Sequence, residues 1–253
     1  MTSYKLSDEN PGYGAFRKIC LGSTSRTIND RLSNAKKHLL LTTSFDEVNA
    51  SALEIAHKEK SLEAELEGVK VTFLPYFIKA TVYALQKDSR RGTPLFNTTI
   101  EIEDRGSGSF DYHYLRHNSY NIGYAVATED RLRVPNVKEA DKKSLLQISD
   151  EVYRKSSAIR KDPMLKSVKD IVAYSDLTNG TFTISNIGSI GGKHATAIPN
   201  FPETSILVAG KIEGKILPLS LTFDHRLVDG AYAVEFMNDI KEFLQSEEKL
   251  SGL

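Results

Sequence analysis

The stretch "LTFDHRLVDGAYAVEF", residues 221–236, joins two apolar elements through a short charged segment. Leu221 and Phe223 alternate with Thr222, as in a β-strand that buries one face. After Gly230 the apolar residues recur with the period of an amphipathic helix. The junction between the two elements carries four ionisable residues: Asp224, His225, Arg226 and Asp229. Such a strand-to-helix junction predicts either a braced turn or a catalytic one.

His225 is the residue at this junction that is best suited to catalysis. It stands where the strand ends, so the strand and the following helix can both hold it, which suits a general base. Asp229 follows four positions later, where it can hold the imidazole ring or cap the helix. A buried, hydrogen-bonded histidine beside a capping aspartate fits the same spacing. The spacing alone leaves both interpretations open.

Composition limits the class of protein. The chain has 253 residues, with 33 Lys+Arg and 33 Asp+Glu, so bulk charge gives no reason to expect a nucleic-acid or membrane partner. Cys20 is the only cysteine, which rules out an intrachain disulfide. No apolar run reaches the roughly 18 residues of a membrane span, and the N-terminus is too polar for a signal peptide. We expect a cytoplasmic protein, or a mitochondrial-matrix protein in a eukaryote.

The pattern of apolar residues predicts mixed α and β structure without repeats or long linkers. Helices are predicted at 23–38, 49–68, 72–88, 141–161 and 230–246. Strands are predicted at 39–48, 97–103, 109–117, 119–128, 132–138, 180–188, 204–212 and 216–223. This order indicates one α+β domain over residues 20–253, preceded by a loose N-terminal segment, 1–19.

Several motifs occur in a fixed order along the chain. They are "SRTINDRL" (25–32), "PLFN" (94–97), "NIGYAV" (121–126), "RVPNVKEAD" (133–141), "GTFTISNIGSIGG" (180–192), "NFPETSILVAG" (200–210) and "DHRLVDG" (224–230). Together they resemble the catalytic domain of the acyltransferase component of 2-oxo acid dehydrogenase complexes. "FTISNIGSIGG" and "VPNVK" favour the branched-chain members of that family.

The resemblance implies a fold of the chloramphenicol acetyltransferase type, a two-layer sandwich with a mixed β-sheet covered by helices. It also implies homotrimers that build a larger hollow core. The family reaction moves an acyl group from a dihydrolipoyl arm to coenzyme A, without a metal. The chain contains no lipoyl or subunit-binding domain, so the lipoyl group is expected from a separate domain or chain. The decarboxylase and dihydrolipoamide dehydrogenase components are the further expected partners.

The same resemblance implies roles for individual residues. His225 matches the general base, Asp229 its polar partner, and Ser185 the hydroxyl that stabilises the tetrahedral intermediate. A thiol has a pKa of about 8.5 and is mostly protonated at neutral pH, so a neutral imidazole can take its proton during attack. A hydroxyl can then donate to the oxygen that becomes negative. In the family the base and the serine come from neighbouring subunits.

Coenzyme A is expected to contact Asn186, Gly210 and Ile212. Thr72 is either a further contact or an ordinary helix cap. Asp224 and Arg226 are expected to pair and brace the turn around His225. Leu253, at the end of the apolar C-terminal tail, is expected to anchor one trimer to the next.

Two other functions fit parts of the pattern. A structural core subunit of such a complex could lack catalysis, but it would not need His225, Asp229 and Ser185 together. An antibiotic acetyltransferase of the same fold would share the spacing of His225 and Asp229, but it would not be expected to keep residues 180–192 and 133–141. We therefore favour the active acyltransferase.

Overall fold

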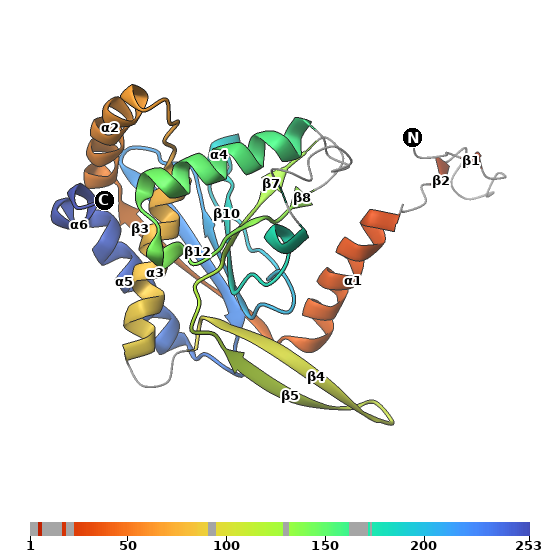
Figure 1. Cartoon of the computed structure of the whole chain (residues 1–253). Helices are drawn as coiled ribbons and strands as arrows, with labels where there is room; N and C mark the ends of the chain where they lie inside the picture. Colours follow the sequence, from red (N-terminus) through yellow and green to blue (C-terminus); the bar gives the residue numbers. More distant parts are fainter. Residues whose placement is uncertain are drawn as a thin grey trace.

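A six-stranded mixed β-sheet forms the centre of the molecule (Figure 1). The computed structural model describes residues 5–6, 17–18, 23–90, 95–128, 132–161, 172 and 174–253. The strand order is β3 (Leu41–Asn49), β12 (Ile216–Asp224), β11 (Ser205–Ala209), β10 (Phe182–Asn186), β6 (Ile122–Tyr124) and β9 (Asn136–Val137). Strand β10 runs parallel to β11 and β6, and the other neighbouring strands are antiparallel.

The two faces of the sheet differ in chemistry. On β12, Leu219 and Leu221 belong to the main hydrophobic core, together with Phe236 of the last long helix. The intervening Ser220 and Thr222 point to the other face, because successive strand residues alternate. There the Thr43 and Thr222 hydroxyls are hydrogen-bonded at 2.8 Å. The alternation in residues 217–223 therefore predicted both faces correctly.

Helices cover the apolar face of the sheet. They are α2 (Ser51–Leu66), α3 (Phe73–Arg90), α4 (Leu145–Lys161), α5 (Gly230–Gln245) and α6 (Glu247–Ser251). Helices α3 and α5 pack against each other, and they reach the sheet at β10 and β3, respectively. Short 3-10 turns complete the chain: η1 (Ala140–Lys142), η2 (Tyr174–Leu177) and η3 (Gly188–Ile190). This arrangement confirms the predicted α+β fold, a mixed sheet covered by helices.

A separate hairpin projects from the body of the molecule (Figure 1). It consists of β4 (Thr98–Gly106) and β5 (Ser109–Arg116). Its base packs against the C-terminal end of α1 (Ser23–His38) in a second, smaller hydrophobic cluster, which includes Ala35, Leu39, Ile100, Ile102, Tyr112, Tyr114 and Phe201. The hairpin thereby reaches the start of β3 and the end of β12.

Some predicted boundaries were wrong. The strands predicted at 119–128 and 132–138 are each divided, into β6 with β7 (Val126–Ala127) and β8 (Leu132–Arg133) with β9. The backbone N–H groups of Tyr124 and Ala125 donate to Pro135 and Ile184, so the chain crosses between partners there. Most of the predicted loose segment, 1–19, lies outside the described residues, apart from the paired strands β1 (Lys5–Leu6) and β2 (Arg17–Lys18).

The C-terminal tail is helical and packs on its own chain. Leu250 of α6 is 2 % exposed and belongs to the main core, and Leu253, two residues after the helix, is partly buried against that core. The tail predicted to anchor a neighbouring trimer therefore already has apolar contacts within its own chain. Within the described ranges, no helix is long and apolar enough to span a membrane.

Candidate functional site

The turn after β12 carries His225 and Asp229 in different environments. His225 is exposed, and its backbone N–H donates to the Leu40 carbonyl at 2.8 Å. Asp229 is the N-cap of α5, and its carboxylate accepts a hydrogen bond from the Tyr232 backbone N–H at 2.8 Å. Of the two roles open for Asp229, the structure thus shows the helix cap. The histidine is not the buried, structural residue of the alternative interpretation.

Asp224 and Arg226 brace this turn, as predicted. The Asp224 carboxylate is fully buried, and the Arg226 Nη2 lies 2.6 Å from its Oδ2. The guanidinium also donates to the His38 carbonyl. The neighbouring carboxylate raises the pKa of Arg226 further above its ordinary value. The backbone on both sides of His225 is therefore fixed while the imidazole stays open to solvent.

Ser185 lies on β10, on the polar face of the sheet. In register it stands opposite Val208 of β11, which in turn stands opposite Ser220 of β12. His225 is five residues beyond Ser220, which corresponds to about 17 Å along the strand and about 10 Å across two strand spacings. The structure therefore does not bring Ser185 and His225 of one chain together.

The four residues predicted to contact coenzyme A do meet. Thr72, Asn186, Gly210 and Ile212 line one groove of about 370 Å³ at the end of the sheet opposite to His225. The remaining lining residues are Glu54, Phe73, Phe77, Gly188, Ser189 and Lys211. Sequence reasoning missed Phe73, Phe77 and Lys211. The two phenylalanines reach the groove through the packing of α3 against the strand ends, which no motif reports, whereas Lys211 directly follows Gly210 after β11. The groove offers an amide, hydroxyls, an ammonium group, the Glu54 carboxylate and apolar walls.

At this groove, two backbone segments approach so closely that two positions require glycine. A Cβ on Gly210 would lie 1.9 Å from the Lys193 carbonyl oxygen, and a Cβ on Gly188 would lie 2.2 Å from the Gly210 oxygen. Gly191 instead adopts a φ of 90°, which a turn requires. Gly191 therefore serves the turn after β10, whereas Gly188 and Gly210 are needed for close backbone packing.

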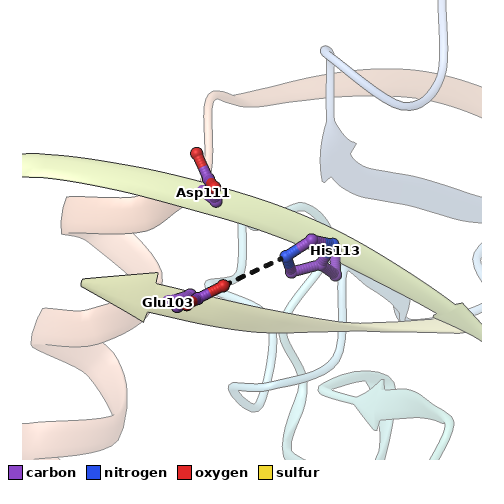
Figure 2. Close-up of side chains that lie close together, drawn as sticks. All are labelled: Glu103, Asp111 and His113. Carbon is purple, nitrogen blue, oxygen red and sulfur yellow. Dashed lines mark ion pairs between the residues drawn. The ribbon is translucent and has the colours of Figure 1, made fainter. Parts of the chain in front are cut away.

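A group of potential metal ligands lies on the β4–β5 hairpin, outside the groove and the turn at His225. Figure 2 shows Glu103, Asp111 and His113, whose ligand atoms lie within 4.8 Å of one another. The Arg105 Nε donates to Asp111 at 2.6 Å, and its Nη2 lies 3.5 Å from Glu103. A guanidinium thus already neutralises the two facing carboxylates. We assign the group to hairpin stabilisation.

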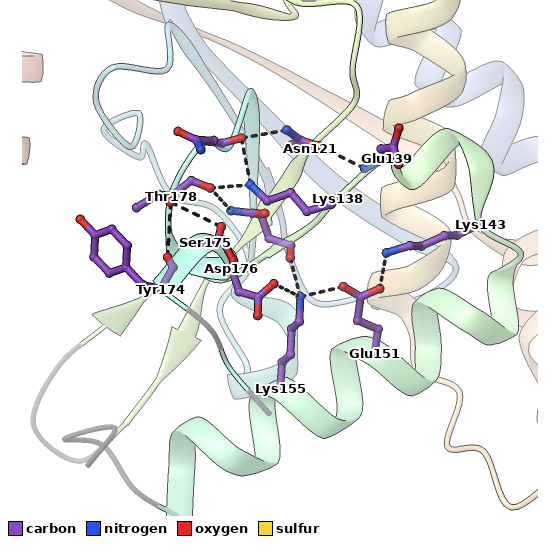
Figure 3. A network of polar contacts seen from close by, with 12 residues as sticks. Asn121, Lys138, Glu139, Lys143, Glu151, Lys155, Tyr174, Ser175, Asp176 and Thr178 are labelled. Atoms are coloured by element: carbon purple, nitrogen blue, oxygen red, sulfur yellow. Dashed lines mark hydrogen bonds and ion pairs between the residues drawn. The ribbon is translucent and has the colours of Figure 1, made fainter. Parts of the chain in front are cut away.

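A second polar network joins α4 to η2 (Figure 3). The Lys155 ammonium, in a side chain only 9 % exposed, contacts Glu151 and Asp176, each at 2.7 Å, and donates to the Asn136 carbonyl. The Lys155 ammonium thus has three partners from separate segments of the chain, so the network holds these elements together. A larger cavity, about 470 Å³, is lined by Arg31, Asn200 and Glu203 among others, and contains none of the predicted site residues.

Comparison with known proteins places the chain in a family. Residues 13–251 match the model of the 2-oxoacid dehydrogenases acyltransferase (catalytic domain). The chain is 35 % identical over 235 residues to the dihydrolipoyllysine-residue acetyltransferase component of the pyruvate dehydrogenase complex of Bacillus subtilis, covering 88 % of this chain and 49 % of that protein. The chain thus spans about half the length of this curated relative.

Solved structures agree with this match. Azotobacter vinelandii dihydrolipoamide acetyltransferase, studied for the role of a serine, a histidine and an asparagine in its catalytic mechanism, has a TM-score of 0.79 and 28 % identity. The cubic core of a pyruvate dehydrogenase multienzyme complex gives the same values. Both comparisons cover 95 % of this chain and 96 % of the other. The chain belongs to the 2-oxoacid dehydrogenase acyltransferase family, as its motifs predicted.

Proposed function

We propose that this chain transfers an acyl group from a dihydrolipoyl sulfur to the thiol of coenzyme A, at a site shared by two neighbouring copies. The observation that carries the proposal is the separation of Ser185 from His225. A general base and a donor to the same intermediate must both lie within hydrogen-bond distance of the reacting atoms. One chain holds them at different ends of a sheet, whereas a second copy can bring its His225 to the partly exposed Ser185 at the end of β10.

In this proposal His225 removes the proton from the coenzyme A thiol as the sulfur attacks the acyl carbonyl. The Ser185 hydroxyl donates to the oxygen of the tetrahedral intermediate, which collapses by expelling the dihydrolipoyl thiolate. Asp229 stands four positions after His225, and in the Azotobacter protein the asparagine stands four positions after the histidine. The shared spacing supports the role of His225 as the general base.

Coenzyme A occupies the groove lined by Asn186 and Gly210. The Asn186 side-chain oxygen accepts a hydrogen bond from the Ser189 N–H at 3.3 Å, which leaves its amide hydrogens for a ligand carbonyl. The Lys211 ammonium, which pairs with Glu213 at 3.1 Å, can exchange that carboxylate for a phosphate of coenzyme A, and Phe73 and Phe77 supply apolar contact area. The groove borders Asn186 at the end of β10, so a bound pantetheine arm has to pass this strand end to reach Ser185 on the other face of the sheet.

We propose acetyl as the acyl group, because the Bacillus relative is named as the acetyltransferase component of the pyruvate dehydrogenase complex. This replaces the branched-chain preference expected from "FTISNIGSIGG". The trimer, a larger core, the lipoyl domains and the decarboxylase and dehydrogenase components belong to the same proposal. The cubic core formed by one structural relative supports it.

An assay of coenzyme A with a panel of acyl-dihydrolipoamides tests this function. We expect transfer of acetyl groups to exceed transfer of isobutyryl and succinyl groups, measured as formation of each acyl-coenzyme A. Preferred transfer of a larger group would correct the substrate and keep the reaction. An intact assembly without transfer of any of these groups would instead indicate the structural core subunit.

A further inference from the structure

The Asp224 carboxylate, next to His225 in the chain, is held by groups from three separate parts of the molecule. Its Oδ1 accepts from the backbone N–H of Leu40 at 3.2 Å and from the Arg226 Nε at 3.0 Å. Its Oδ2 accepts from the Arg226 Nη2 at 2.6 Å and from the Tyr114 hydroxyl at 2.9 Å. Among these donors, Tyr114 is the one that belongs to the projecting hairpin.

Tyr114 is fixed by its surroundings. It packs in the small hydrophobic cluster at the base of the hairpin, beside Ile100 and Leu41. Burial and the adjacent Asp224 carboxylate raise the pKa of its phenol to about 12, so the hydroxyl remains a donor at neutral pH. Tyr112 lies two residues before Tyr114 on the same face of β5, and the centre of its ring is 4.5 Å from the Arg226 guanidinium carbon. The hairpin thus contacts both residues that flank His225.

We propose that Tyr114 is a positioning residue for His225, which couples the β4–β5 hairpin to the catalytic turn; the inference rests on the proposed function. Leu40 donates to Asp224 and accepts from the His225 N–H, so the two adjacent residues share one anchor. Rotation of the Asp224 carboxylate would therefore displace the His225 backbone. The Tyr114 hydroxyl opposes that rotation, because a fully buried carboxylate oxygen otherwise loses one of its two donors.

Tyr114→Phe removes the hydroxyl and keeps the ring in its cluster. Small displacements of a catalytic group lower turnover by up to 10²-fold, so we expect kcat to fall about tenfold. The KM for coenzyme A should stay unchanged, because its groove lies at the opposite end of the sheet. A loss of structure throughout the protein would instead change both kcat and the KM for coenzyme A.

The matched control is Tyr83→Phe. The Tyr83 hydroxyl donates to the Glu242 carboxylate at 2.8 Å, on the helical side of the molecule, so the control deletes the same kind of bond away from His225. Both variants are assayed at a temperature where their melting curves show them fully folded. A kcat for Tyr114→Phe within twofold of that of Tyr83→Phe would overturn the proposal.

Hydrogen–deuterium exchange gives a readout that does not depend on activity. The amides of Asp224 and His225 donate to Thr204 and Leu40 carbonyls, so exchange in a peptide covering 221–231 should be faster in Tyr114→Phe than in Tyr83→Phe. Equal exchange in the two variants would overturn the positioning role. If wild-type protein transfers no acyl group, the proposed function fails, and the exchange comparison still decides whether Tyr114 holds the turn.

Discussion

At the scale of single residues, the exposed imidazole of His225 is the group on which the proposed chemistry depends. We predict that His225→Ala lowers kcat by about 100-fold or more, because general-base catalysis contributes about 10²–10⁴-fold. The assembly should persist, since the His225 side chain is exposed and its anchor is the backbone N–H. Initial rates of acetyl-coenzyme A formation check this, with the exposed His194→Ala as control. Near-wild-type turnover of His225→Ala would remove this residue from the mechanism.

Gly210 tests the coenzyme A groove at the same scale. In Gly210→Ala the new methyl group would meet the Lys193 carbonyl at 1.9 Å, so one backbone segment must move. We expect the KM for coenzyme A to rise about tenfold or more, and the melting temperature to fall.

The control for that change is Gly252→Ala, in which the nearest atom would lie at 3.5 Å, an ordinary contact. It should keep the wild-type KM. A Gly210→Ala protein with wild-type KM would show that coenzyme A binds elsewhere.

At the scale of elements, Glu203 joins β10 to the segment before β11. Its carboxyl group is 1 % exposed, accepts from the Thr183 hydroxyl at 2.6 Å and from the Asn200 amide at 3.0 Å, and lines the larger cavity with Arg31. Burial raises its pKa to about 7, against hydrogen bonds and the Arg31 charge, which lower it. The folded protein therefore holds a proton that the unfolded chain has released between about pH 4.5 and 7.

Because the folded-state pKa lies above the unfolded one, the free energy of unfolding should fall as pH rises through this window, by about 3 kcal/mol from this group. Glu203→Gln keeps the shape and removes the titration. We expect denaturant unfolding at fixed protein concentration to show a flatter dependence between pH 5 and 8 in the variant. Parallel curves for variant and wild type would mean that Glu203 does not titrate in this range.

Elements also show where sequence reasoning succeeded. The alternation in β12 and the period in α5 predicted both faces of the sheet and the buried side of the helix, because each pattern reports burial directly. The division of the strands at 119–128 and 132–138 depends on which partner each backbone N–H finds across the sheet. The hydrogen bond from Tyr114 to Asp224 joins residues 110 positions apart, and no local pattern reports such a contact.

At the scale of the whole molecule, the sheet topology separates the two catalytic residues of the proposed site, Ser185 and His225. The motifs predicted the braced turn correctly. The four residues expected to contact coenzyme A line one groove, and their contact with coenzyme A stays a prediction. The 40-position separation alone allows Ser185 and His225 to meet within one chain or between two, and the family resemblance favoured a pairing between neighbouring subunits. The register across β10, β11 and β12 agrees with that expectation, because the two residues lie too far apart in one chain. The central claim is therefore that the active site is completed by a second copy.

Co-expression of two inactive variants tests this claim most directly. His225→Ala and Ser185→Ala homotrimers are each defective at every site, but a mixed trimer can unite an intact His225 from one copy with an intact Ser185 from the next. With equal, random mixing, about a quarter of all sites are intact, and a cyclic trimer that contains both variants has about one intact site in three. Differently tagged variants, purified through both tags with the mixed composition confirmed by mass, should therefore recover acyl transfer well above either homotrimer. A verified mixed trimer with no recovered activity would contradict the account, because a site within one chain always keeps one defective partner.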